Sequence, residues 1–295
     1  MDLSIIIPCH NEAGNLPGLI ADIRKIMDPR PESYEVIVVD DASTDDTAEA
    51  AAEAGARVVS HPYNLGNGAA VKAGIRAASG EIVLMMDGDG QHRPEVIPQI
   101  LENLEQYDLV VGARTSKSHA GVHRFAANTI YNWLASYVTK FRILDLTSGF
   151  RGTRRKTALR YLYLLPNTFS YPTTMTMAFL RSGLSLKYIP IDAPPRGQGS
   201  KSKIRLFSDG AIFFLIITKI ATIFSPFRIF LPLSAGLFFT GCGYYLYTFL
   251  TMHRFTNMSM LLLMSSIIIF MLGLVSEQIS QLRMDRTEGV DAETR

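Results

Sequence analysis

The first 114 residues alternate short apolar runs with stretches of helical periodicity. Runs rich in Ile, Val, Leu and Met, each ending in polar residues, predict strands at Leu3 to Pro8, Glu35 to Asp40, Ala56 to Ser60, Glu81 to Met86 and Asp108 to Gly112. Helical spacing and helix-end signals predict helices from Leu16 to Met27, in an Ala-rich stretch that Ser43 or Thr44 opens and Gly55 closes, up to Ser79 and Gly80, and from Pro94 onward. This alternation is typical of an α/β fold with a parallel sheet.

The predicted strands all end in polar loops. In open parallel sheets, ligands bind beyond the carboxyl ends of the strands. We therefore expect the loops at residues 8–15, 40–46, 64–68 and 87–92 to line one crevice.

The pattern changes after residue 115. The polar run Arg196 to Lys203 predicts a loop, and Ile204 to Arg228 mixes large apolar residues with cations, which suits a helix lying in a membrane interface. Ile229 to Thr251 has 23 uncharged residues and Phe255 to Ser276 has 22, each enough to span about 30 Å of hydrocarbon. Lys and Arg gather at the outer flanks rather than in the turn Met252 to Arg254, which predicts two transmembrane helices with both ends in the cytoplasm.

Composition agrees with a membrane-associated chain. Of the 295 residues, 47% are hydrophobic and 19% are charged, and the mean hydropathy is +0.14. The net charge of +2 gives no reason to expect nucleic acid as a partner. Cys9 falls in a predicted strand and Cys242 in a predicted membrane helix, which excludes a disulfide framework and a Cys-based zinc site. The N-terminus lacks the features of a signal peptide and is expected to form the first strand.

An acidic motif follows the fourth predicted strand. In extended backbone, side chains at i, i+2 and i+4 project to one side, so Asp87, Asp89 and Gln91 are predicted to present oxygens toward one point. Mg²⁺ and Mn²⁺ take such ligands and are commonly held by one or two carboxylates plus substrate phosphates. The alternative is a solvated acidic turn. The position at the end of a buried strand, with Gln91 in phase, favours the metal site.

Other strand-end residues are candidates for a nucleotide site. Asp40 can accept hydrogen bonds from a base or ribose, whereas Asp45 is better suited to capping the following helix. Glu12 could bind a ribose hydroxyl or belong to a turn. The loop Asn64 to Gly68 could bring backbone N–H groups to a phosphate or form a simple turn. Val71 stands where the third glycine of a dinucleotide fingerprint belongs, which disfavours a Rossmann dehydrogenase.

Six motifs occur in order along the chain: Pro8 to Glu12, Asp40 to Asp45, Asn64 to Gly68, Asp87 to Glu95, Gly112 to Arg114 and Thr147 to Arg151. Together they resemble the motifs of family 2 glycosyltransferases with the GT-A fold. More narrowly, they resemble the polyprenyl-phosphate glycosyltransferases, which include dolichyl-phosphate mannose synthases and bactoprenol glucosyltransferases. The resemblance covers about residues 3–205 and extends to the membrane part, because a C-terminal pair of helices is one of the layouts in that family.

The resemblance implies roles for particular residues. The nucleotide sugar would be bound by Pro8, Asn11, Glu12, Asp40, Asp87 and Asp89, with Glu12 and Asp40 at the nucleoside. The divalent metal, Mg²⁺ or Mn²⁺, would be bound by Asp87, Asp89 and Gln91. The implied catalytic residues are Asp89, Arg114, Arg124 and Ser148, with both arginines facing the acceptor phosphate and Ser148 near the sugar. The loop that closes over donor and acceptor would contain Arg196, Ser200 and Lys201. Gly88 departs from the commoner Asp-Ala-Asp motif without removing a ligand.

The implied chemistry needs no general base. A polyprenyl monophosphate has a second pKa near 6 and is already anionic at pH 7. The metal would stabilise the departing nucleoside diphosphate, and arginines would position the incoming phosphate for in-line attack on the anomeric carbon. Direct displacement would invert that carbon.

The predicted organisation is an α/β, Rossmann-like GT-A catalytic domain at 1–203, amphipathic juxtamembrane helices at 204–228, a transmembrane hairpin at 229–280 and a cytoplasmic tail at 281–295. The chain is thus expected to be an integral, multi-pass membrane protein whose catalytic domain lies in the cytoplasm. Its expected partners are a nucleotide sugar, a polyprenyl phosphate such as undecaprenyl or dolichyl phosphate, and membrane lipids, with no nucleic acid. A homo-oligomer is left open.

Three other functions stay open. A processive polysaccharide synthase typically carries a Gln-x-x-Arg-Trp motif, and Trp133 lacks that context. A glycosyltransferase with a glycan or other hydroxyl acceptor would need an additional acidic motif, and none is evident. The third is a non-catalytic, nucleotide-binding membrane protein. For the donor, the two-helix tail favours a UDP-sugar such as UDP-glucose by analogy with bactoprenol glucosyltransferases, with GDP-mannose the next candidate.

Overall fold

The computed structural model describes residues 1–114, 122–167, 170–192, 218, 222 and 225–292. The chain divides into two compact units, Met1–Phe214 and Leu215–Arg295. The predicted loop Arg196 to Lys203 and most of the predicted interfacial segment Ile204 to Arg228 lie outside the described residues. The predicted boundary at residue 203 lies in this undescribed part, and the predicted boundaries at 203, 228 and 280 all stay predictions.

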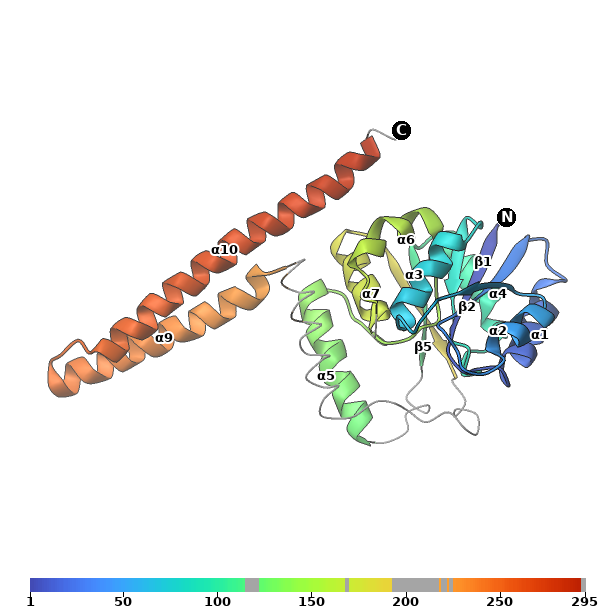
Figure 1. The fold of residues 1–295 in the computed structure, drawn as a ribbon. Helices are drawn as coiled ribbons and strands as arrows, with labels where there is room; N and C mark the ends of the chain where they lie inside the picture. The colour runs from blue at the N-terminus through green and yellow to red at the C-terminus, as the bar shows by residue number, and fades with distance from the viewer. Residues whose placement is uncertain (115–121, 168–169, 193–217, 219–221, 223–224, 293–295) are drawn as a thin grey trace. The chain divides into compact units, whose positions relative to one another are not determined.

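The first unit is built on a seven-stranded sheet in the order β3-β2-β1-β4-β6-β5-β7. Figure 1 shows this sheet together with the helices that pack against it. Its strands are β1 (Leu3–Cys9), β2 (Tyr34–Asp40), β3 (Arg57–Ser60), β4 (Ile82–Met85), β5 (Leu109–Arg114), β6 (Arg151–Arg154) and β7 (Leu186–Ile191). Its helices are α1 (Leu16–Met27), α2 (Thr47–Glu53), α3 (Asn67–Ala77), η1 (Pro94–Val96), α4 (Ile97–Leu104), α5 (Val122–Thr139), α6 (Arg155–Tyr161), η3 (Leu162–Leu164) and α7 (Tyr171–Arg181). The five predicted strands and the predicted helices from Leu16 and Pro94 are confirmed to within a few residues.

Strand β1 is buried on both faces, as its continuous apolar sequence predicted. Ile5 and Ile7 belong to the core cluster that includes Leu16 of α1. Ile6 points to the other face, where α3 packs so closely that a Cβ added at Gly74 would lie 2.3 Å from Ile6 Cγ2. Helices therefore cover both faces of the sheet, and its strand ends are what remains open for a ligand.

The five predicted strands run parallel to one another, as predicted, but the sheet is mixed because it contains a further, antiparallel strand that the sequence analysis missed. Strand β6 runs antiparallel to β4 and β5 and separates them, with Arg151 opposite both Met85 and Val111. Its sequence Arg-Gly-Thr-Arg has no apolar run, which is why the sequence pattern missed it. Because β6 is antiparallel, the chain enters it at the carboxyl ends of its neighbours. This brings the Thr147 to Phe150 loop to the same edge of the sheet as the loop after β4.

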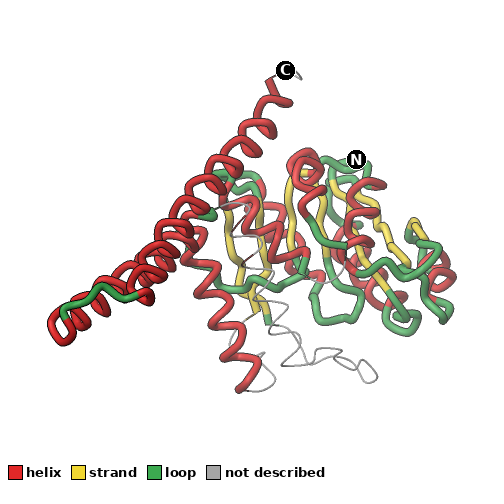
Figure 2. The backbone as a smooth tube through the Cα atoms, turned by 60° about the vertical axis from the view of Figure 1, so that its left-hand side comes forward, coloured by secondary structure: helices red, strands yellow, loops and turns green. Residues whose placement is uncertain are grey.

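The second unit consists of α9 (Phe227–Met252) and α10 (Asn257–Ala292), which run side by side in opposite directions (Figure 2). The Ser266 hydroxyl of α10 donates to the Ser234 carbonyl of α9 at 2.9 Å. By length and composition, Phe227–Met252 and Asn257–Leu282 could each cross a membrane. Both predicted apolar helices are confirmed, although α10 continues to Ala292 and so includes most of the predicted tail.

Candidate functional site

The loops after β1 and β2 are joined by hydrogen bonds between side chains and backbone. Asn11 has a positive φ of 61°, and its Oδ1 accepts the N–H of Thr44 at 2.8 Å. The Asn11 N–H donates to Ser43 Oγ at 2.9 Å, and Asp40 Oδ1 accepts the Ser43 N–H at 3.0 Å. The two predicted nucleotide-site loops therefore form one unit at the carboxyl edge of the sheet.

Helix α2 begins later than predicted. It starts at Thr47, because Ser43 and Thr44 are engaged in the loop contacts just described, so the prediction that one of them caps the helix was wrong. Asp45 Oδ1 accepts the Thr47 N–H at 3.2 Å, but the N-cap position of α2 is occupied by Asp46, whose side chain makes no capping hydrogen bond. The Glu12 N–H donates to the Thr47 hydroxyl at 2.9 Å and fixes the backbone of the β1 loop.

Asp41 is a buried residue to which the sequence analysis gave no role. Its carboxylate accepts hydrogen bonds from His61 Nδ1 at 2.7 Å and from the N–H groups of Leu65 and Gly66, both at 2.8 Å. Burial raises the pKa of Asp41, but these hydrogen bonds outweigh it and hold the pKa below its ordinary value. The Asn64 to Gly68 loop thus uses two of its N–H donors on Asp41, which favours the simple-turn alternative over a phosphate loop.

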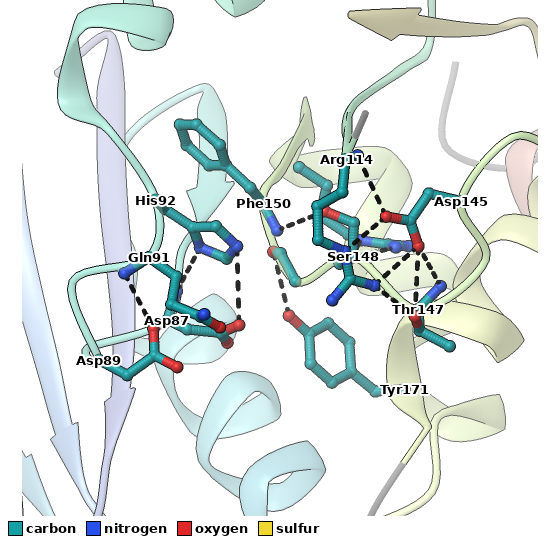
Figure 3. Close-up of polar contacts among 12 residues, drawn as sticks. Asp87, Asp89, Gln91, His92, Arg114, Asp145, Thr147, Ser148, Phe150 and Tyr171 are labelled. Atoms are coloured by element: carbon teal, nitrogen blue, oxygen red, sulfur yellow. Dashed lines mark hydrogen bonds and ion pairs between the residues drawn. The ribbon is translucent and has the colours of Figure 1, made fainter. Parts of the chain in front are cut away.

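The acidic motif after β4 forms a turn and not the extended segment that was predicted, with Gly90 at a φ of 73°. Figure 3 shows the turn and its polar contacts. The Asp87 N–H donates to His92 Nδ1 at 2.9 Å, and Asp87 Oδ2 lies 3.7 Å from His92 Nε2. Asp89 Oδ1 accepts the Gln91 N–H at 3.1 Å. The three predicted ligands still lie in one short turn. The argument that side chains at i, i+2 and i+4 of an extended strand point to one side does not apply to them, because the backbone is turned.

His92 fixes this turn from its buried side. Its side chain is buried and stacks on Phe150, with ring centroids 5.0 Å apart and planes inclined by 15°. Burial lowers the pKa of His92, which keeps the imidazole neutral at pH 7. Since Nδ1 accepts the Asp87 N–H, the ring proton resides on Nε2, on the side of the Asp87 carboxylate.

Two glycines allow close packing around the turn. A Cβ added at Gly149 would lie 2.7 Å from Asp87 Oδ1, and one added at Gly88 would lie 2.8 Å from Cys9 Sγ. The thiol of Cys9 thus occupies the space that an alanine at position 88 would need. The Asp87 side chain remains 37% exposed, so its carboxylate can reach a ligand.

On the other side of the site, Arg114 at the end of β5 forms a bidentate ion pair with Asp145. Its Nε lies 2.8 Å from Asp145 Oδ2 and its Nη2 lies 3.0 Å from Asp145 Oδ1, and Nη2 also donates to the Thr147 hydroxyl at 2.6 Å. Burial raises the pKa of Asp145, but the Arg114 guanidinium outweighs it and keeps the carboxyl ionised. The ion pair fixes the plane of the guanidinium, which is 29% exposed.

Arg151 is entirely buried at the start of β6. Its Nε donates to the Ser148 carbonyl at 3.0 Å, and its Nη1 donates to the Pro172 carbonyl at 2.8 Å and to the Thr176 hydroxyl at 3.2 Å. The guanidinium also lies over the Tyr171 ring, 5.9 Å from its centroid. This one side chain therefore ties the Ser148 loop to the start of α7.

The structure brings most of the predicted site residues to one edge of the sheet. Asp87, Asp89 and Gln91 face the group formed by Arg114, Asp145 and Thr147, with Phe150 and Tyr171 between them (Figure 3). Ser148 is buried, and its Oγ accepts the Phe150 N–H at 3.3 Å. Pro8, Asn11, Glu12 and Asp40 lie in or beside the loops after β1 and β2. Arg124 lies in α5, but its side chain is outside the described part, as are residues Arg196, Ser200 and Lys201.

The donor set fits a divalent cation that substrate helps to hold. Within the described residues, no three His, Cys, Asp or Glu side chains gather into a metal cage. Two carboxylates and an amide in one turn, with Asp87 partly exposed, would offer a cation an incomplete set of oxygen ligands. Mg²⁺ is usually bound in this way, with phosphate oxygens and water completing the shell.

Asp145, Arg151 and His92 organise this site, and the sequence analysis gave a role to none of them. Arg151 and His92 stood inside quoted motifs, but nothing in a motif distinguishes a buried cation or imidazole from an exposed one. For Asp145, the available signal was that an arginine at the end of a buried strand needs a counter-ion nearby.

Comparisons with known proteins agree with this geometry. A family model described as Glycosyl transferase family 2 matches residues 4–162, and one described as GtrB C-terminal hairpin matches residues 225–282. A dolichyl-phosphate hexose transferase of Haloferax volcanii is 30% identical over 222 residues, covering 74% of this chain and 93% of its own. An undecaprenyl-phosphate mannosyltransferase of Micrococcus luteus is 30% identical over 213 residues, covering 68% of this chain and 86% of its own.

A solved structure shares the fold of the first unit. It is glucosyl-3-phosphoglycerate synthase from Mycobacterium tuberculosis in complex with Mn²⁺, uridine diphosphate and glucosyl-3-phosphoglycerate. It is 25% identical with a TM-score of 0.56, and the match covers 74% of this chain and 77% of that one. The predicted GT-A fold is confirmed.

Proposed function

This chain belongs to glycosyl transferase family 2, and on that premise we propose that it transfers a sugar from a nucleotide sugar to the phosphate of a polyprenyl phosphate. The observation that carries the proposal is the combination of a family 2 domain with a GtrB-type hairpin of two apolar helices. Two relatives that share most of their length with this chain are named for transfer to undecaprenyl or dolichyl phosphate. A long-chain lipid phosphate is accessible only at a membrane surface. The hairpin would hold the catalytic domain at that surface.

On the donor side, the loops after β1 and β2 would bind the nucleoside through Glu12 and Asp40. Asp87, Asp89 and Gln91 would hold Mg²⁺ or Mn²⁺ against the diphosphate. The neighbour of the same fold, whose complex contains Mn²⁺ and uridine diphosphate, supports this assignment. The bound cation would neutralise the charge that develops on the leaving nucleoside diphosphate. His92 and Gly149 hold Asp87 in place for that role.

On the acceptor side, Arg114 would bind and orient the incoming phosphate together with Arg124. The Asp145 carboxylate fixes the Arg114 guanidinium and is itself occupied by it, so it is poorly placed to take a proton from an acceptor. A phosphate nucleophile needs no such base, because it is already ionised at pH 7. In-line attack on the anomeric carbon would therefore proceed with inversion, and the positive charge supplied by arginine would bring two anions together.

We also propose the organisation and the location. Residues 1–203 would form the catalytic domain, 204–228 the juxtamembrane helices, 229–280 the membrane hairpin and 281–295 the tail. The catalytic domain and both ends of the hairpin would face the cytoplasm, as the distribution of Lys and Arg predicts.

The direct test supplies the full-length protein in membranes with undecaprenyl phosphate and, separately, with UDP-glucose, UDP-GlcNAc and GDP-mannose. We expect labelled sugar from one donor to become extractable into organic solvent in a metal-dependent way. Label that stays in the aqueous phase on a glycan would support a hydroxyl acceptor instead, and absence of turnover with all donors would contradict the proposed reaction.

The acceptor assignment has its own test in Arg124→Ala. We expect the apparent KM for polyprenyl phosphate to rise about tenfold or more, while the KM for the nucleotide sugar changes little, because one charge-assisted contact to the phosphate is lost. Lys25→Ala, which removes an exposed cation on α1, is the matched control and should leave both constants unchanged. An equal effect of Arg124→Ala on both substrates would remove Arg124 from the acceptor site.

A further inference from the structure

The second half of α5 carries an exposed pair of aromatic side chains. Trp133, the single tryptophan of the chain, is 65% exposed and stacks on Tyr137, which is 50% exposed, with ring centroids 6.5 Å apart. The opposite face of the helix is buried through Ala135 and Val138. Within the described residues, α5 thus buries one face and carries the exposed aromatic pair on another.

The chain after α5 turns back along this helix. Asn132 Nδ2 donates to the Leu144 carbonyl at 2.8 Å, and the Ile143 N–H donates to Ser136 Oγ at 3.0 Å. These contacts place Leu144, which is 50% exposed, beside the residue that precedes Trp133. The returning segment therefore lies against the same half of α5 that carries the aromatic pair.

Two exposed cations complete this surface. Lys140 and Arg142 lie in the returning segment between Tyr137 and Leu144, and both are exposed. We call Trp133, Tyr137, Lys140, Arg142 and Leu144 the α5 surface. The sequence contains no Asp or Glu between residues 115 and 144, so no carboxylate of this segment offsets these charges.

This combination matches the chemistry of an anionic lipid surface. Trp and Tyr are the residues enriched at membrane–water interfaces, where one end of the ring system is apolar and the other is hydrated. Lys and Arg near the bilayer surface are attracted to anionic headgroups. The absence of acidic side chains from so long a segment favours a negatively charged leaflet as the surface that it contacts.

We propose that the α5 surface docks on the anionic leaflet of a membrane and is a second membrane contact, separate from the helical hairpin. The inference rests on the proposed function, because it explains how the acceptor phosphate reaches the site. Leu144 is directly followed by Asp145, the residue that holds the Arg114 guanidinium. Docking would therefore bring Arg114 to the level of the headgroups, where a polyprenyl phosphate presents its own phosphate.

The single tryptophan makes the docking measurable in the full-length protein. We would reconstitute it in nanodiscs containing phosphatidylglycerol, with and without bromine on acyl carbons near the headgroup. We expect blue-shifted emission from Trp133 and a clear loss of its fluorescence in the brominated discs. The matched control carries Trp133→Phe together with Tyr63→Trp. Tyr63 is 64% exposed in the loop after β3, which forms the opposite edge of the sheet from β7, and this control should show water-like emission without quenching.

The alternative outcomes are distinct. Water-like, unquenched emission from Trp133 would overturn the proposal. Blue-shifted emission without bromine quenching would overturn it too, because protein, either the hairpin or a second copy of the chain, would then cover Trp133. Equal quenching of the control would show that contact with lipid is not specific to the α5 surface. None of these fluorescence measurements requires turnover, so their outcome tests the membrane contact independently of the proposed enzymatic reaction.

A kinetic arm connects the docking to the reaction. Lys140→Gln with Arg142→Gln should raise the apparent KM for membrane-embedded polyprenyl phosphate by up to about fivefold for each charge removed. The KM for nucleotide sugar, and the turnover of a short-chain, water-soluble prenyl phosphate, should not change. An equal loss with the soluble acceptor would show that these cations act on the site rather than on the membrane contact.

Discussion

The two sides of the site are stabilised by opposite kinds of charge. After β1 and β2, carboxylates such as Asp40 and Asp41 accept hydrogen bonds from the N–H groups of nearby loops. Around β5 and β6, guanidinium groups of Arg114 and Arg151 donate to a carboxylate, hydroxyls and carbonyls. We call the loops after β1, β2 and β4 the acidic side, and the region around β5 and β6 the basic side. Under the proposed function, the acidic side would bind a cation with its diphosphate and Arg114 on the basic side would bind a second anion, so that one sheet edge would hold two negatively charged substrates next to each other.

The largest loss of activity is expected from a substitution at the predicted metal ligand Asp89. Asp89→Ala should lower kcat about a thousandfold, because a lost cation ligand removes several kcal/mol of stabilisation from the leaving diphosphate. The melting temperature should stay close to that of the unaltered protein, since Asp89 is partly exposed in a turn.

Glu95→Ala, which removes an exposed carboxylate from η1, is the control for Asp89 and should retain full activity. Removal of divalent ions with EDTA should reproduce the loss in the unaltered protein, with recovery on adding Mg²⁺ or Mn²⁺. Activity that persists in EDTA would count decisively against the metal role of the acidic side.

The basic side is tested through its structure. Arg151→Met should lower the free energy of unfolding by about 3 kcal/mol, because the carbonyls of Ser148 and Pro172 would stay buried without their donor. Denaturant unfolding of the protein in detergent measures this. Arg154→Met, in the same strand but with a side chain that is 48% exposed, should cost about 1 kcal/mol or less. Similar losses of unfolding free energy for both variants would mean that the buried Arg151 guanidinium contributes no more to stability than the exposed Arg154 guanidinium.

The same contrast explains what the sequence could predict. On the acidic side, Asp40 and Asp87 follow unbroken apolar runs, so their place at the carboxyl edge followed from strand patterns alone. The turn at Gly90 was not visible in that pattern, because an Asp-x-Asp sequence is compatible with both extended and turned backbone. The metal-ligand assignment itself still awaits the experiment on Asp89.

On the basic side, the sequence was much less informative. Strand β6 contains buried Arg151 and Thr153, and polar residues of this kind give no strand periodicity. The pairing of Arg114 with Asp145 joins positions 31 residues apart. Such a pair depends on which strands become neighbours, and an antiparallel strand inserted between β4 and β5 could not be anticipated from a βαβ pattern.

A smaller loss of stability is expected from Asp41→Asn, which tests the hydrogen bonds that the buried Asp41 carboxylate accepts. At neutral pH the free energy of unfolding should fall by about 1–2 kcal/mol, because the carboxylate accepts three hydrogen bonds that an amide can only partly replace. The pKa of folded Asp41 lies below the ordinary 3.8, so its contribution is complete above that value and is lost as the pH falls through the folded pKa.

The difference between the Asp41→Asn variant and the unaltered protein should therefore shrink in acid, as urea titrations at a series of pH values would show. Asp46→Asn, at an exposed position close by, is the control and should change little at any pH. A difference that is independent of pH would mean that the charge of Asp41 does not contribute.

The insertion of β6 between β4 and β5 also has a consequence for biosynthesis. Strands β3, β2, β1 and β4 pair with one another and come from the first 85 residues, so they can assemble early as the chain leaves the ribosome. Among the described strands, β5 pairs with β6 and β7, so its pairing in the sheet must wait until residue 154 has been made. The nascent chain can therefore complete the half of the sheet that contains β1 to β4 before the half that contains β5, β6 and β7. Both halves are synthesised ahead of the two apolar helices, the first of which begins at Phe227, so the sheet can close before these helices leave the ribosome.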